Sequence, residues 1–156
     1  MKKFLSLFFV LIILGVLGIA IAGVLVDNST SQKVEKEISA IKLPDGATID
    51  ATTSGTGKLT VKNGALQFYG AILIKSSEPL GLIKSHYQKE YKGDLIPKED
   101  LMVIPLSQAK GVLGPDFPED LRFSYHDSAA EGYYMIYAFV NGQDPFPMFD
   151  YRTYFG

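Results

Sequence analysis

The sequence contains no cysteine and no tryptophan, and it has only two histidines. Without cysteine there can be no disulfide framework, thiolate zinc site, iron–sulfur cluster, cysteine nucleophile or lipid attached through an N-terminal cysteine. The lack of tryptophan removes one of the commonest components of a sugar-stacking surface. Several large classes of function are therefore excluded.

Concentrated positive charge is also missing. Of the 15 lysines and arginines, Lys2 and Lys3 lie at the start of the chain, so the rest carries 13 basic against 17 acidic residues, a net charge of −4. A nucleic-acid-binding protein needs a basic patch that neutralises phosphates, whereas the lysines here are scattered among acids. We expect no nucleic-acid partner.

No complete motif for a metal, a cofactor or a catalytic nucleophile is present. His86 and His126 each lack a second histidine at helical or strand spacing, so we expect both to be surface or boundary residues rather than ligands. Ser124, Asp127 and Ser128 surround His126, but contiguous strand residues point alternately to opposite faces and seldom form the hydrogen bonds of a triad. We therefore predict no catalytic residue, no metal and no cofactor.

Residues 54–58, Ser-Gly-Thr-Gly-Lys, resemble a fragment of a phosphate-binding loop. A complete loop needs a glycine five positions before Gly57 and a hydroxyl after the lysine, and Thr52 and Leu59 occupy those positions. We interpret the segment as a flexible hairpin tip.

The most informative feature is the run that begins at Phe4 and ends at Val26. It carries no charge, and only Ser6 and three glycines interrupt its aliphatic and aromatic side chains. In a helix, about 20 apolar residues cross the ~30 Å hydrocarbon core of a bilayer. We expect residues 1–27 to form a membrane anchor and residues 28–156 to form one domain.

The charges around this run predict its orientation. Lys2 and Lys3 precede it and Asp27 follows it, and the positive end of a membrane helix stays in the cytoplasm. The prediction is a single-pass membrane protein with an extracytoplasmic C-terminal domain. The alternative is a domain secreted after cleavage near Ala22, because Ala20-Ile21-Ala22 fits a signal-peptidase site, although the apolar run exceeds the usual signal core.

This layout resembles that of pilin-type subunits, which also place a short basic leader and a long apolar helix before a small α+β domain. The glutamate characteristic of their apolar helix has no counterpart between Phe4 and Val26. The chain is therefore not assigned to that family.

After the apolar run, Ser29 and Gln32 have the spacing of a capping box, which predicts the start of a helix that ends at Leu43-Pro44. A second helix is predicted after Ser77, which can cap it. The apolar stripe of this second helix comprises Leu80, Ile83, Tyr87 and Tyr91.

Runs rich in β-branched and aromatic residues predict strands between and after these helices. The expected strands are residues 47–53, 58–62, 65–75, 101–106, 121–126 and 133–141, and residues 111–120 are expected to form a surface loop. Asn63-Gly64 fits a hairpin turn, and Gly70 indicates a bulge or a close backbone contact. The last strand should be central because it is apolar almost throughout. The resulting fold class is α+β, with a mainly antiparallel sheet and two helices on one face.

Aromatic residues are concentrated toward the C-terminal end of the chain, at Tyr133, Tyr134, Tyr137, Phe139, Phe146, Phe149, Tyr151, Tyr154 and Phe155. These rings could line a binding groove, but packing in the core is favoured, together with a tail at residues 148–155 that covers a sheet edge.

The leading functional hypothesis is a membrane-tethered extracytoplasmic module of the cell envelope that binds another envelope component and is not an enzyme. Two alternatives stay open. One is an envelope hydrolase that uses carboxylates such as Glu119, Asp120 or Glu131, and the other is an accessory subunit of a membrane complex.

Overall fold

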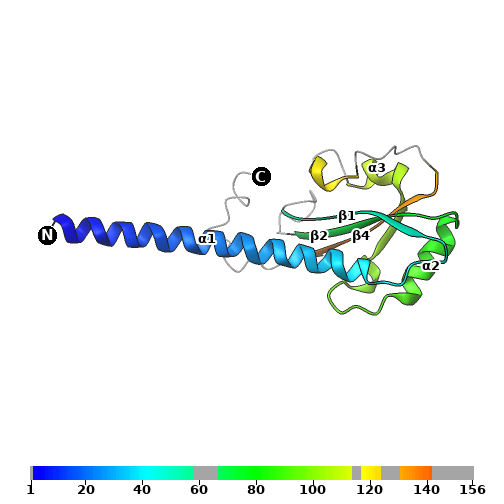
Figure 1. Ribbon diagram of the computed structural model, residues 1–156, viewed down its shortest axis with the longest axis horizontal. Helices are drawn as coiled ribbons and strands as arrows, with labels where there is room; N and C mark the ends of the chain where they lie inside the picture. The colour runs from blue at the N-terminus through cyan, green and yellow to red at the C-terminus, as the bar shows by residue number, and fades with distance from the viewer. Residues whose placement is uncertain (1, 58–66, 114–116, 124–130, 142–156) are drawn as a thin grey trace.

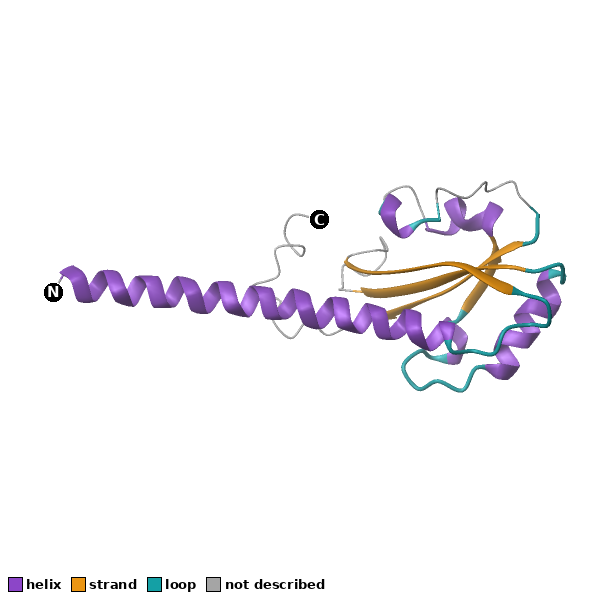
Figure 2. Cartoon of the chain, in the orientation of Figure 1, coloured by secondary structure: helices purple, strands orange, loops and turns teal. Residues whose placement is uncertain are grey.

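The computed structural model describes residues 2–57, 67–113, 117–123 and 131–141, and before Asp27 it describes the side chains of residues 10–16, 18, 21, 22, 25 and 26. A long helix, α1, extends from one end of a small domain in which helices enclose a sheet (Figures 1 and 2). In chain order the elements are α1 (Lys2–Ser39), β1 (Thr48–Gly57), β2 (Gln67–Lys75), α2 (Leu80–Glu90), η1 (Lys98–Asp100), β3 (Met102–Pro105), η2 (Leu106–Gln108), α3 (Ala109–Leu113), η3 (Glu119–Leu121) and β4 (Tyr133–Asn141), where η denotes a 3₁₀ helix.

The strands form one antiparallel sheet in the order β1-β2-β4-β3. β2 and β4 pair along their whole lengths, and every residue of β2 except Lys75 is buried. β1 lies on the other side of β2, with a register shift between Ile49 and Ala51. The predicted antiparallel sheet and the central position of residues 133–141 are confirmed.

Side chains of the sheet alternate between two cores, one on each face. On one face, β2 and β4 pack against α1 and α2 through Val34, Ile38, Ile72, Ile74, Ile83, Tyr87 and Ile136. On the other face they pack against the segment between β3 and β4 through Tyr69, Leu73, Leu106, Leu113, Phe117, Leu121, Phe123 and Tyr137. The two predicted helices do share one face, but the opposite face is covered as well.

This second layer corrects two sequence predictions. The predicted surface loop at residues 111–120 is wrong, because its described residues include the end of α3 and the start of η3, and Leu113 and Phe117 are buried. The predicted strand at residues 121–126 is wrong for its described part, because Leu121 ends η3 and the next two residues lie in a turn. Leu121 and Phe123 are nevertheless buried, in the alternating pattern that a strand would show. A tight turn can also direct every second side chain toward the core.

α1 is a single helix from Lys2 to Ser39, so the predicted helix start at Ser29 is wrong. The hydroxyls near that point bond to carbonyls of the preceding turn instead of capping a new helix. Thr30 Oγ1 donates to Val26 O at 3.0 Å, and Ser31 Oγ donates to Asn28 O at 3.0 Å. Among the residues that the structure describes, no helix combines the length and the apolarity needed to cross a membrane.

Gly70 lets α1 lie directly on the sheet. A Cβ at this position would lie 2.9 Å from both Glu35 Cα and Val34 C, which are backbone atoms of the helix. Gly70 is paired in register with both neighbouring strands. Of the two predicted explanations for this glycine, the close backbone contact is therefore confirmed, and the irregularity of the sheet lies in β1.

The predicted hairpin tip at residues 54–58 is wrong for its described part. Residues 54–57 belong to β1 and pair with β2, from Ser54 opposite Gly70 to Gly57 opposite Gln67. The run of small and hydroxyl-bearing residues therefore forms an edge strand.

α2 buries the predicted stripe, since Ile83, Tyr87 and Tyr91 are buried and Leu80 packs against them. The predicted cap is wrong, because Pro79 precedes the helix without a side-chain cap. Ser76 takes a related role one residue earlier than expected, because its Oγ accepts a hydrogen bond from Glu78 N at 3.1 Å.

Several predictions lie outside the described residues. These are the strand at residues 58–62, the turn at Asn63-Gly64, the tail strand at residues 148–155, the aromatic residues after Asn141, and Ser124, His126, Asp127 and Ser128.

A carboxylate on α1 holds the loop that follows α2. Glu37 Oε1 accepts hydrogen bonds from the Tyr91 hydroxyl, from Leu95 N at 3.1 Å and from Ile96 N at 3.3 Å. The Tyr91 hydroxyl oxygen also lies 2.7 Å from Ile96 O and accepts a hydrogen bond from Ile96 N at 3.1 Å. Burial and the bond to Glu37 raise the pKa of Tyr91 above its ordinary value. One side chain thus connects α1, the end of α2 and the approach to β3.

We expect Glu37→Ala to lower the free energy of unfolding by about 2 kcal/mol, because it removes the acceptor of Leu95 N, whereas the Tyr91 hydroxyl and Ile96 keep the bonds between them. Urea denaturation of the full chain in detergent measures this change. Glu37→Gln is the matched control, because its amide oxygen can accept the same bonds, and it should lose less than half as much. Equal losses for the two variants would mean that the contact holds the loop through packing alone.

Candidate functional site

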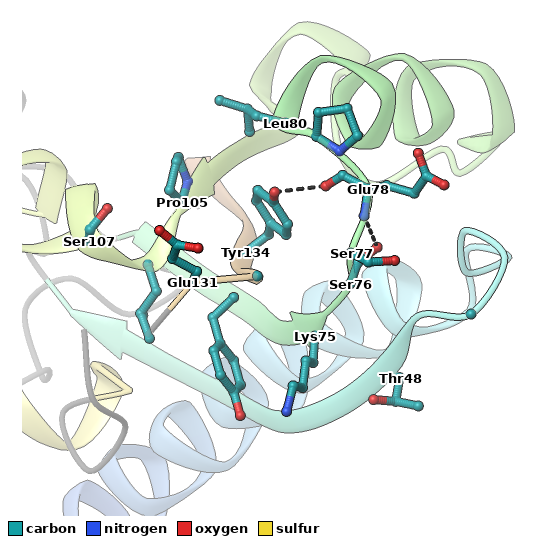
Figure 3. A pocket seen from close by; sticks show the side chains of 15 residues that line it. Thr48, Lys75, Ser76, Ser77, Glu78, Leu80, Pro105, Ser107, Glu131 and Tyr134 are labelled. Carbon is teal, nitrogen blue, oxygen red and sulfur yellow. Dashed lines mark hydrogen bonds between the residues drawn. The ribbon is translucent and has the colours of Figure 1, made fainter. Parts of the chain in front are cut away.

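The described part of the domain has an open groove of about 830 Å³ at the end of the sheet where β2 ends and β4 begins (Figure 3). Four junctions form its walls: the entry into β1, the turn from β2 into α2, the passage from β3 into η2, and the entry into β4. Its lining residues are Gly46, Thr48, Lys75, Ser76, Ser77, Glu78, Pro79, Leu80, Pro105, Leu106, Ser107, Glu131, Gly132, Tyr133 and Tyr134.

Hydrogen bonds fix the floor of the groove. Ser76 N donates to Gly132 O at 2.8 Å, which extends the pairing of β2 with β4 by one residue. Gly132 has φ of +82°, and a Cβ there would lie 2.9 Å from Ser76 O, so only glycine fits this turn. The Tyr134 hydroxyl donates to Glu78 O at 2.7 Å and joins β4 to the start of α2 (Figure 3). The backbone around the groove is therefore set before any ligand enters.

The charged groups of the groove are one lysine and two glutamates. Lys75 Nζ lies 5.5 Å from the centre of the Tyr133 ring, which is within the range of a cation–π contact. In Figure 3 the ring of Tyr134 separates the carboxylates of Glu78 and Glu131. These groups, with the hydroxyls of Ser77 and Ser107, provide hydrogen-bond donors and acceptors beside the apolar surface of prolines and leucines. That mixture suits recognition of a polar partner.

Glu119 and Glu131, two of the three carboxylates that the sequence singled out, lie apart in the structure. Glu131 lines the groove, whereas Glu119 is exposed in η3, on the layer between β3 and β4. Asp120 follows in the same 3₁₀ helix. Within the described ranges, no three histidine, aspartate or glutamate side chains gather closely enough to hold a metal ion.

His86 is half-buried on α2, as the sequence predicts. Its Nε2 lies 2.6 Å from Lys42 O, so it bonds to the connection between α1 and β1. The histidine therefore contacts backbone at the boundary of the domain.

The described aromatic residues of β4 divide between core and groove. Tyr137 is buried, and Phe139 packs with Tyr69 and Phe117, their ring centres 5.2 and 6.1 Å away. Tyr133 and Tyr134 lie at the groove. Core packing is thus confirmed for part of the aromatic cluster, and two rings contribute to the surface.

No pattern in the sequence indicates the groove directly. Lys75-Ser76-Ser77-Glu78 is visible as a polar junction between an apolar strand and a helix, but Pro105 to Ser107 and Glu131 lie far away in the chain. Only the strand order, with β4 between β2 and β3, brings these junctions together.

A second feature is the uncovered apolar part of α1. The described large apolar side chains there are all exposed, for example Leu11 at 60%, Leu14 at 59% and Leu25 at 64%. The same helix is fully buried at Val34 and Ile38, where it meets the sheet. One helix therefore combines a part covered by the domain with a part that the domain leaves bare (Figure 1).

No protein-family model, curated protein or solved structure matches this chain.

Proposed function

We propose that the protein is a membrane-tethered extracytoplasmic module whose groove binds another component of the cell envelope. The observation that carries the proposal is α1, in which a bare apolar stretch continues without interruption into the helix on which the sheet packs. Apolar surface in water costs about 25 cal/mol per Å², so such a stretch needs a nonaqueous environment.

The amino-acid sequence supports a bilayer as that environment. Every residue from Phe4 to Val26 is uncharged, including those whose side chains lie outside the described set. Lys2 and Lys3 before this stretch favour a cytoplasmic N-terminus, which would place the domain on the other side of the membrane. Cleavage near Ala22 would export the same domain but would release it.

Binding is favoured over hydrolysis by the arrangement of the groove. In the view of Figure 3 the Tyr134 ring lies between its two carboxylates. Glu119 belongs to η3 and does not line the groove. The mixed polar and apolar lining provides contacts for a partner with its own hydrogen-bonding groups.

The anchor is tested by adding charge to the bare part of α1. We expect the full-length chain to stay in the membrane fraction after alkaline carbonate extraction. Leu11→Arg with Leu14→Arg should release it or block insertion, because each arginine costs about 3 kcal/mol near the centre of a membrane helix.

The matched control is Leu82→Arg with Val112→Arg, since both residues are also apolar and exposed but lie on α2 and α3. This control should behave like the unmodified chain. Recovery of unmodified chain at full mass in the soluble fraction would contradict the proposal, and a mature chain starting at Gly23 would replace the anchor with secretion.

In the same membranes, partner binding is tested by cross-linking from one cysteine, because the chain has none of its own. Ser107→Cys in the groove should give a saturable cross-linked product. Ser85→Cys, on the exposed face of α2, should not. Identical products from the two positions would argue against the groove as the binding surface.

A further inference from the structure

α1 leaves very little chain between the apolar run and the domain. The run ends at Val26, and Ser31 is already buried against the domain at 2% exposure. At 1.5 Å per residue, this short piece of continuous helix spans only about 8 Å. Sharp kinks in helices arise at proline or at a broken backbone hydrogen bond, whereas residues 27–31 contain no proline and lie within one uninterrupted helix.

The direction of the strands relative to α1 follows from the connections. β1 begins near the C-terminal end of α1 and runs back along it, and β2 is antiparallel to β1, so β2 runs in the same direction as α1 (Figure 1). Gly70 beside Val34 and Glu35 fixes the register between helix and strand.

This register gives the height of each end of the sheet above the apolar run. Gln67 lies three residues before Gly70. At 3.3 Å per strand residue it is about 10 Å closer than Gly70 to the N-terminal end of α1. At 1.5 Å per helix residue this places Gln67 beside about Asn28 of α1. Lys75 lies five residues beyond Gly70, so the groove is roughly 30 Å from Val26 along the helix axis.

We infer that the end of the sheet where β2 begins and β4 ends lies at the level of the lipid headgroups, and that the groove, at the other end of β2, faces away from the bilayer. The inference depends on the proposed membrane anchor. At that end Gln67 is buried and its Nε2 donates to Asn141 Oδ1 at 3.3 Å, whereas Asn141 is exposed. The partner of the groove is then a component on the aqueous side, at a height of roughly 30 Å, and not a lipid beside the anchor.

Two contacts fix the orientation of the domain relative to α1. The backbone of α1 lies directly on Gly70, and Glu37 bonds to the loop after α2. Both contacts involve the part of α1 that follows Ser31. The domain must therefore tilt together with the anchor.

The test measures the distance of two positions from the membrane surface. Asn141→Cys and Ser107→Cys full-length chains, each carrying one fluorophore, are reconstituted into phospholipid vesicles that contain nitroxide-labelled headgroups. We expect quenching of the fluorophore at position 141 to be several-fold stronger than at position 107. Co-flotation with the vesicles is measured on the same samples, so failure of the anchor is detected separately.

A flexible glycine–serine insertion after Asn28 is the matched control. It keeps the anchor and the folded domain but breaks the helix, and it should bring the quenching at the two positions close together. Equal quenching in the uninterrupted chain, or stronger quenching at position 107, would overturn the inference even if the chain floats with the vesicles. Thermal denaturation followed by circular dichroism confirms that each labelled chain is folded.

Discussion

Gly70→Ala should destabilise the protein by about 2 kcal/mol, and Gly70→Val by more, because overpacking a well-filled contact costs roughly 1–3 kcal/mol. The added Cβ would lie 2.9 Å from Glu35 Cα and Val34 C. Neither atom can move without shifting the helix backbone, and Val34 is itself fully buried. The ordinary benefit of replacing glycine in a regular element, about 0.5–1 kcal/mol, is therefore outweighed.

Gly81→Ala is the matched control for this prediction. Gly81 lies in α2, and a Cβ there would have no neighbour within 4 Å among the described atoms. Alanine should stabilise the helix by up to about 1 kcal/mol. Urea denaturation of the full chain in detergent compares the two variants, and a stabilised Gly70→Ala variant would show that α1 does not lie on the sheet as described.

The second large effect is expected at high pH. Burial raises the pKa of Tyr69 and Tyr87 well above the ordinary value of about 10, and both side chains are fully buried. Above pH 10 these tyrosines ionise in the unfolded chain but stay protonated in the folded one. The unfolded state then binds fewer protons, so the free energy of unfolding falls as pH rises, by about 1.4 kcal/mol per pH unit for each tyrosine. Below pH 10 both states are protonated and these tyrosines contribute no pH dependence.

Tyr87→Phe isolates one of these contributions. Within the described residues the Tyr87 hydroxyl is buried without a hydrogen-bond partner, so its removal should cost little at neutral pH. The slope of the free energy of unfolding against pH should become shallower by about 1.4 kcal/mol per pH unit above pH 10.

Ile83→Val, at a neighbouring buried position on α2, is the control for Tyr87→Phe. It should lower stability by about 1 kcal/mol at every pH and leave the slope unchanged. An unchanged slope in Tyr87→Phe would mean that this hydroxyl reaches solvent in the folded chain.

The parts of the fold that the sequence predicted best are those with a strong local pattern. β2 and β4 are unbroken apolar runs, which is typical of strands covered on both faces, and the stripe of α2 follows helical spacing. The layer on the second face was missed because its apolar residues, Leu106, Leu113, Phe117 and Leu121, are spaced irregularly and separated by glycine and proline. Their burial depends on the sheet beneath them and not on a regular period.

The start of α1 and the groove were harder to predict from the sequence, for a different reason. Ser29 and Gln32 have the spacing of a cap, but hydroxyl groups can also bond within a helix, and the choice depends on the residues on both sides. The sequence named Glu131 as a candidate carboxylate but did not place it in a groove, because the groove is built from junctions that are distant in the chain.

The short strand β3 has a consequence for how neighbouring copies of the chain meet. It is an edge of the described sheet, it has four residues, and its last residue is Pro105, which offers no amide hydrogen. A four-residue edge that ends in proline is a poor template for adding a strand from another molecule. Copies of the chain at high concentration should therefore resist joining their sheets through β3.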